Sequence, residues 1–149
     1  MIHIDEILTE LEVAISAGQS FIAVTLAWRR VLPYASDREI ARAQQRVVSR
    51  HRERVQKAGL AAPFILSVFE STARMGTHGH LMAGVPGSPE KWLLAIERQL
   101  AREFGDLPPG FPWRDGRHAG RILTAAAARG AAAYRLKSIV ADGERGIRR

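Results

Sequence analysis

The sequence predicts an α+β fold, an antiparallel sheet with a split βαβ, ferredoxin-like core. Segments rich in β-branched and aromatic residues alternate with segments of helical periodicity, in the order strand, helix, strand, strand, helix, strand. The 149 residues show no internal repeat and no linker long enough to divide them, and 46% are hydrophobic, which is enough for one core. We expect one domain, 1–149, with helices largely on one face, an extra N-terminal helix in 1–18 and a flexible basic tail in 142–149.

The chain opens with a helix and a strand. Residues 4–17 repeat apolar side chains at helical spacing, and Gly18 can end the helix. The apolar face consists of Ile4, Ile7, Leu8, Leu11 and Ile15. Residues 20–28, SFIAVTLAW, are β-branched and aromatic, which is typical of a buried strand.

A long helix is predicted over residues 36–59, where Ser36 and Glu39 have capping-box spacing. Its apolar side consists of Ile40, Ala43, Val47, Val48 and Val55. Its other side carries an arginine at every fourth position, Arg38, Arg42, Arg46, Arg50 and Arg54. Steps of four residues drift by about 40° around a helix, so the stripe winds as a groove-tracking surface would. Two interpretations of this arginine stripe are open. Arg42 and Arg46 could contact phosphates, or the stripe could simply be a face exposed to solvent.

Two more strands are expected to form a hairpin. Residues 62–71, APFILSVFES, and 77–85, THGHLMAGV, are joined by a short turn at 73–76. A helix then begins at Ser88, a capping residue followed by proline, and runs to Gly105.

The C-terminal part begins with a Pro- and Gly-rich loop, 106–120. A short strand, 120–124, and an alanine-rich helix, 124–141, follow it. Trp113 and Arg114 in the loop offer an aromatic and a cationic surface on which unpaired bases could stack. A loop residue that plugs the gap between helix and sheet is the alternative.

The predicted hairpin brings three metal-ligand side chains together. His78 and His80 point the same way because side chains alternate along a strand. If the turn is centred on Arg74, Glu70 pairs directly with His78, and paired residues share a face. A slip of one residue would disperse the cluster. Two imidazoles and a carboxylate suit Mn²⁺, Zn²⁺ or Fe²⁺, whereas two surface histidines beside a turn are the alternative.

The last helix carries a candidate nucleophile. Tyr134 and Lys137 are three residues apart, so they share a helix face. A nearby ammonium and a metal-bound phosphate would favour the phenolate. The small residues 130–133 before them would let this helix approach the sheet closely. A tyrosine that packs its ring and leaves its hydroxyl in water is the alternative.

The charge distribution points to a polyanionic partner. The net charge is +7, and residues 114–149 carry nine basic and three acidic side chains. Such a chain suits nucleic acid, although an arginine-rich, GC-rich genome would also produce it. The absence of cysteine excludes disulfides and thiolate metal sites. No apolar run reaches the roughly 18–20 residues of a membrane span, and the acidic N-terminus is unlike a signal peptide, so we expect a cytoplasmic protein.

Three motifs of the sequence occur in the same order as three motifs of a known protein family. FIAVTLAW is similar to a family's first strand, THGHLMAGVP to its histidine motif with Glu70 as the acidic ligand, and AAAYRLKSI to its Y-x-x-K motif. Over residues 20–140 the chain thus resembles the HUH endonuclease superfamily, in particular single-tyrosine rolling-circle replication initiators. That family prefers a bulky apolar residue between the two histidines, where this chain has Gly79. Gly79 should face the opposite, helix-covered side of the sheet, where neighbours must supply the packing.

The resemblance implies metal-dependent nicking and joining of single-stranded DNA, an origin or a hairpin, in rolling-circle replication of a plasmid or phage. Mn²⁺ or Mg²⁺ at Glu70, His78 and His80 would polarise the scissile phosphate. Tyr134 would attack phosphorus and form a 5′-phosphotyrosine, with Lys137 positioning the phosphate. Expected DNA contacts are Arg42, Arg46, Trp113, Arg114 and Arg135. No Walker motif is present, so a host helicase is a further expected partner.

Other functions fit parts of the same pattern. A metal-dependent hydrolase could use the three ligands with an activated water and would not need Tyr134. A non-catalytic single-stranded nucleic-acid-binding module could use the sheet and the basic helices, although the aromatic pairs expected on such a sheet are not evident. A transposase-like HUH relative is a third alternative.

Overall fold

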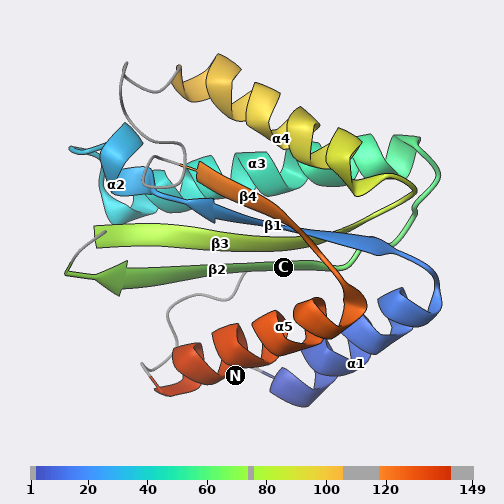
Figure 1. Ribbon diagram of the computed structural model, residues 1–149. Coiled ribbons are helices and arrows are strands. Elements are labelled where there is room, and N and C mark those ends of the chain that lie inside the picture. The colour runs from blue at the N-terminus through green and yellow to red at the C-terminus, as the bar shows by residue number, and fades with distance from the viewer. Residues whose placement is uncertain (1–2, 74–75, 106–117, 142–149) are drawn as a thin grey trace.

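The computed structural model describes residues 3–73, 76–105 and 118–141 (Figure 1). The elements follow the predicted order, with one additional short helix after the first strand. They are α1 (Ile4–Ser16), β1 (Ser20–Leu26), α2 (Trp28–Val31), α3 (Asp37–Lys57), β2 (Ile65–Thr72), β3 (Gly76–Val85), α4 (Pro89–Phe104), β4 (His118–Leu123) and α5 (Ala125–Ala141).

The sheet confirms the predicted α+β fold class. Its strand order is β2-β3-β1-β4, and each neighbouring pair is antiparallel. Helix α3 connects β1 to β2, and α4 connects β3 to β4, which is the split βαβ arrangement. Both helices cover the same face, as predicted, but α1 and α5 lie side by side on the other face (Figure 1). The helices therefore cover both faces.

Apolar residues on both faces of the strands explain the second helical layer. One core lies between the sheet and α3 and α4, and a second lies between the sheet and α1 and α5. The second core contains Ile7, Leu11, Ala14, Phe21, Phe64, Leu66, Val68, Met82, Leu123, Ala128, Ala132 and Leu136. Ala128, Ala132 and Leu136 have no exposed surface, so the small residues of α5 let this helix sit close to its neighbours. A bidentate ion pair between Arg129 and Glu12, at 2.6 and 3.1 Å, joins α5 to α1.

Strand β1 ends earlier than the sequence predicts. It stops at Leu26, and Trp28 begins the short helix α2 instead of closing the strand. The reason is tertiary, because the Trp28 indole is completely buried and its Nε1 donates to Oε1 of Gln44 on α3 at 2.9 Å. Its ring also packs edge-on against Phe104 of α4, with centroids 5.1 Å apart. The predicted start of α3 is confirmed, since Ser36 Oγ accepts the backbone N–H of Glu39.

Gly79 leaves space for a polar side chain of α3, Gln44, to pack against the sheet. Gln44 is buried, and its amide nitrogen donates to Ser67 Oγ at 2.7 Å and to the Val68 carbonyl at 3.2 Å. A Cβ at position 79 would lie 1.6 Å from Oε1 of Gln44. Gly79 faces away from the two histidines, as predicted, toward the side covered by α3 and α4, and Gln44 of α3 supplies the packing that the glycine lacks.

Replacing Gly79 with alanine should lower the unfolding free energy by about 2–4 kcal/mol, measured by urea denaturation. The added methyl group forces Gln44 away from its three buried partners, which stay behind without hydrogen bonds. Gly130→Ala is the matched control, because no atom beyond its own helix lies within 4 Å of a Cβ there. That control should gain about 0.5–1 kcal/mol of helix stability. Equal effects of the two substitutions would contradict the account of Gly79.

A second buried polar residue, His51, lies on the inner side of α3. Its side chain has no exposed surface. Burial, reinforced by the charges of Arg54 and Arg52 and opposed by a contact with the Gly84 backbone, lowers the pKa of His51 to about 4 from the usual 6.5. The folded protein therefore holds His51 neutral at a pH where the unfolded chain would protonate it.

This difference makes stability depend on pH. The stabilisation is complete above pH 6.5, the unfolded pKa, and is lost progressively as the pH falls toward 4. Between pH 6.5 and 4.5 the contribution of His51 should fall by about 2 kcal/mol. Urea denaturation of wild type and His51→Leu across this range measures it as the difference between the two pH profiles. Parallel profiles would refute the assignment to His51.

Candidate metal centre

The hairpin of β2 and β3 places Glu70, His78 and His80 together. Glu70 pairs with His78, and Val68 with His80, so the predicted register is confirmed. Oε2 of Glu70 lies 3.2 Å from His78 Nε2 and 3.1 Å from His80 Nε2. The two imidazoles meet edge to face, with centroids 5.0 Å apart. One donor atom from each residue lies within 4.8 Å of the other two, so the group could hold a metal ion.

The second nitrogen of each imidazole has a partner that orients the ring. Nδ1 of His78 lies 3.0 Å from the Gly76 carbonyl oxygen, which can only accept, so Nδ1 carries the proton. Nδ1 of His80 lies 3.3 Å from the Thr25 hydroxyl, which can accept in the same way. A hydrogen bond from Nε2 to the Glu70 carboxylate requires a proton on Nε2, because a carboxylate can only accept. A bound metal ion would replace that proton, with Nδ1 of each ring donating to its own oxygen partner. Such outer partners are what metal-ligating histidines usually have.

Arg135 of α5 holds the other oxygen of the carboxylate. Its Nη1 donates to Oε1 of Glu70 at 3.0 Å, while Oε2 faces the histidines. The sequence predicted Arg135 as a DNA contact, and the structure places it against Glu70. One ion pair thus fixes the carboxylate and ties α5 to the hairpin.

The electrostatics favour the protonation states that a metal ion needs. Burial, reinforced by Arg135 and partly opposed by Glu70, lowers the pKa of His80 to about 4. Burial alone would raise the pKa of Glu70, but the nearby His80 and Arg135 outweigh it and hold this pKa below its usual value. At neutral pH the site therefore offers a neutral His80 and an ionised Glu70.

The donor geometry also fits a small divalent ion. Ligand atoms about 2.0–2.2 Å from an ion lie roughly 3–3.5 Å from one another. The distances of 3.2 and 3.1 Å from Oε2 of Glu70 to the two Nε2 atoms lie in this range. Side-chain exposures of 3% for His78, 13% for His80 and 18% for Glu70 leave the group partly open. Three protein ligands leave coordination positions for a substrate oxygen.

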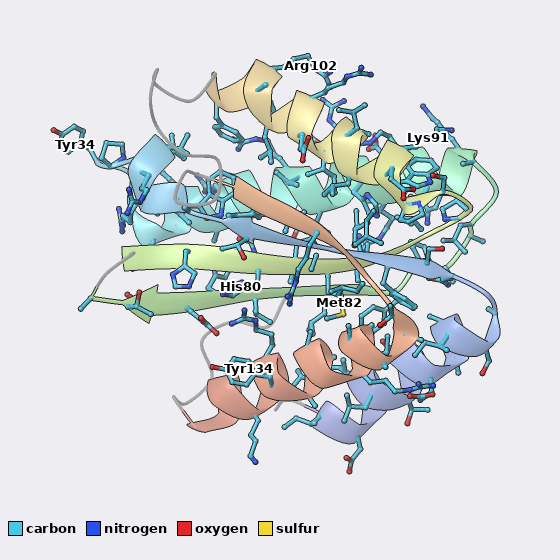
Figure 2. All side chains as sticks on the ribbon, viewed as in Figure 1. Tyr34, His80, Met82, Lys91, Arg102 and Tyr134 are labelled. Carbon is cyan, nitrogen blue, oxygen red and sulfur yellow. The ribbon has the colours of Figure 1, made fainter. Side chains whose placement is uncertain are left out.

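The predicted nucleophile lies on the same side of the sheet as the three ligands. Tyr134 projects from α5, with 64% of its surface exposed, on the sheet face that carries His80 (Figure 2). The guanidinium carbon of Arg135 lies 5.3 Å from the centroid of the Tyr134 ring. The group that holds Glu70 therefore also contacts the tyrosine. Lys137 is exposed on the same helix, three residues further on.

Two of the other predicted DNA contacts, the arginines on α3, are not at this site. Arg42 and Arg46 lie on the exposed side of α3, on the opposite face of the sheet, and Arg46 faces Glu103 at 4.0 Å. They cannot touch a phosphate that is bound at Glu70. Trp113 and Arg114 lie outside the described residues.

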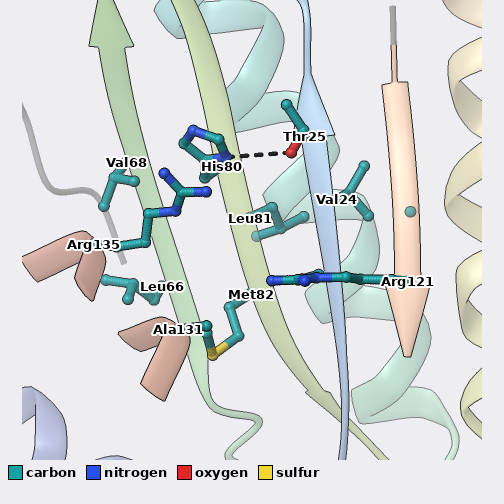
Figure 3. Close-up of a pocket in the computed structure, with 12 residues that line it drawn as sticks. Val24, Thr25, Leu66, Val68, His80, Leu81, Met82, Arg121, Ala131 and Arg135 are labelled. Carbon is teal, nitrogen blue, oxygen red and sulfur yellow. Dashed lines mark hydrogen bonds between the residues drawn. The ribbon is translucent and has the colours of Figure 1, made fainter. Parts of the chain in front are cut away.

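Sequence reasoning missed a pocket beside the metal ligands (Figure 3). It has a volume of about 330 Å³, and its lining includes Thr25, His80, Met82, Arg121 and Arg135. The pairing of Thr25 with His80, and of Ala23 with both Met82 and Arg121, places these residues on one face. The alternation within each strand was readable from the sequence, but the register between β1 and its two neighbours was not.

Comparison with protein-family models, with curated proteins and with solved structures gave no significant match to this chain. Among the described residues, no helix combines the length and the apolar character that crossing a membrane requires.

Replacing His78 with alanine should weaken Mn²⁺ binding by about 100-fold or more, because one of three protein ligands is lost. Thr25→Val should weaken it by about 10-fold, since it removes only the group that orients His80. Isothermal titration calorimetry measures both. His3→Ala is the matched control, because His3 is exposed before α1 and should leave the affinity unchanged. Wild-type affinity in His78→Ala would remove His78 from the ligand set.

Proposed function

We propose that this protein nicks and rejoins single-stranded DNA by transesterification, with Mn²⁺ or Mg²⁺ at Glu70, His78 and His80 and with Tyr134 as the nucleophile. The contact of Arg135 with both the Glu70 carboxylate and the Tyr134 ring is the observation that carries the proposal. It connects a candidate metal centre to an exposed phenol on one face of the sheet.

The chemistry requires a phosphate group that is made electrophilic and a nucleophile within reach. A divalent ion bound by the three ligands would polarise the scissile phosphate and offset its negative charge. Neutral imidazoles and an ionised carboxylate suit that role, which is the state described above for Glu70 and His80. A phosphate near this site would also meet the guanidinium of Arg135, which adds positive charge where negative charge develops.

In the proposed reaction the phenol oxygen of Tyr134 attacks phosphorus, and the bond from phosphorus to the 3′ oxygen breaks. The phenolic proton is released to solvent, and the departing 3′ oxygen takes up a proton, so the products are a free 3′-hydroxyl and a 5′-phosphotyrosine. Attack of a 3′-hydroxyl on this intermediate reverses the step and rejoins a strand without an external energy source. Lys137, on the same helix face as Tyr134, would help to position the phosphate.

The biological role that fits this chemistry best is initiation of rolling-circle replication of a plasmid or phage. The resemblance of the three motifs to single-tyrosine initiators supports this role, together with the group of Glu70, His78 and His80 that could hold a metal ion. Single-stranded DNA at an origin or hairpin is the proposed substrate, and a host helicase would supply it.

A covalent-adduct assay tests the proposal. Single-stranded DNA from the genomic neighbourhood of the gene is labelled at its 3′ end, incubated with protein and Mn²⁺, and boiled in detergent. The strand 3′ of the nick should stay on Tyr134, so a 3′ label should shift with the protein and a 5′ label should not. Tyr134→Phe should lose the adduct by at least about 10³-fold, because no phenol oxygen remains.

Tyr34→Phe is the matched control, since Tyr34 and Tyr134 are the two tyrosines and Tyr34 is 99% exposed and remote from α5. This variant should form the adduct at the wild-type rate. Adduct in Tyr134→Phe, or adduct that persists in EDTA, would refute the proposed mechanism. Cleavage without any adduct would instead support a metal-dependent hydrolase that uses water.

A further inference from the structure

The pairing registers lay out the pocket beside the metal ligands as two rows of side chains. The first row holds Val68, His80 and Thr25, which pair across β2, β3 and β1. The second row lies two residues away from the first on β1, β2 and β3. It extends across all four strands and holds Leu66, Met82, Ala23 and Arg121. The first row therefore carries a metal ligand, His80, and the adjacent row carries the apolar side chains of Leu66, Met82 and Ala23. We call this second group the apolar floor of the pocket.

Small side chains create the space above this floor. Ala23 stands in the centre of the second row between the longer Met82 and Arg121, and Ala131 of α5, another small residue, also lines the pocket. Leu66 and Met82 line the pocket and are otherwise buried, so the core fixes their positions and only a small part of each side chain borders the space. The resulting volume of about 330 Å³ lies at the lower end of the range for small-ligand sites.

Two guanidinium groups border the pocket. Arg135 enters from α5 beside His80 and is paired with Glu70. Arg121 extends from β4 across β1 toward Met82 (Figure 3). Within the part of the chain that the structure describes, the guanidinium of Arg121 makes no hydrogen bond and no ion pair. The pocket thus combines apolar side chains with the guanidinium of Arg121, whereas Glu70 offsets the charge of Arg135. This combination is complementary to a planar apolar group that carries a phosphate.

We propose that this pocket binds one unpaired nucleotide, with its base on Leu66, Met82 and Ala131 and its phosphate toward Arg121. The inference rests on the proposed function, because His80 lines the pocket and would place this nucleotide next to the scissile phosphate. A base can enter only after it leaves a duplex, which would give the site its preference for single strands. The base that fits would also set a sequence preference at that one position.

Methyl NMR of the metal-free protein in EDTA tests the pocket directly. The chain has three methionines, and Met82 lines the pocket, so the ¹³C-labelled methyl group of Met82 reports occupancy. Titration with deoxythymidine and deoxyadenosine monophosphates should shift the Met82 signal saturably, and ribose 5-phosphate, which has no base, should bind at least about 10-fold more weakly. No saturable shift of Met82, or equal shifts with ribose 5-phosphate, would overturn the proposal.

Two variants of pocket residues and one control variant extend the test. Ala131→Leu fills the space above the floor and should weaken nucleotide binding at least about 10-fold. Ala133→Leu, an exposed position on the same helix, is the matched control and should bind as wild type does. Arg121→Gln should weaken binding and reduce its dependence on salt, and it remains informative if Ala131→Leu does not fold. Wild-type affinity in Arg121→Gln, or in a folded Ala131→Leu, would overturn the proposal.

The outcomes separate this inference from the proposed nuclease. Nucleotide binding is measured without metal and without cleavage, whereas the adduct assay needs both metal and Tyr134. A protein that forms the adduct but shows no response at Met82 would refute the pocket alone. A protein that binds nucleotides at Met82 but forms no adduct would leave the pocket as a nucleotide site and refute the nuclease.

Discussion

The site depends on one constraint, the pairing of Glu70 with His78 across β2 and β3. This register puts a carboxylate and two imidazoles on one face, and a shift of one residue would send one strand's ligands to the other face. Each imidazole is then oriented by a local oxygen, the Gly76 carbonyl for His78 and the Thr25 hydroxyl for His80. The hairpin thus supplies the ligands, and the central strand β1 helps to orient one of the two imidazoles, that of His80.

The opposite face of the same strands is held by Gln44. Its side chain bonds Trp28, Ser67 and the Val68 carbonyl, and it occupies the space that a side chain at Gly79 would need. A glycine between two metal-ligating histidines therefore has a packing reason. Buried polar groups of this kind are satisfied only in one arrangement, so they favour the register that the metal ligands require.

Helix α5 brings the second half of the candidate chemistry to the sheet. Its small residues allow close packing, its Arg129 pairs with Glu12 of α1, and its Arg135 pairs with Glu70. The acidic N-terminal helix consequently offsets part of the basic C-terminal charge. The arginines on the outer side of α3 face away from the metal ligands, so a strand that is bound at Glu70 does not reach them.

The sequence by itself determined the local features of this protein. Periodicity located the helices and strands, the Ser36 cap marked the start of α3, and a hairpin with a short turn aligned Glu70 with His78. These features depend on residues close together along the chain. The early end of β1 at Leu26 was mispredicted because Trp28 is drawn to Gln44, which is far from it in sequence.

Tertiary structure alone decided which distant residues share a face. The registers of β1 with β3 and β4 brought Thr25 to His80 and Arg121 to the pocket, and the docking of α5 brought Arg135 to Glu70. Tertiary structure also placed the Arg42 and Arg46 stripe on the far side of the sheet. A strand pattern specifies which residues alternate, but the partner strand and its offset are chosen by the packing of the whole core.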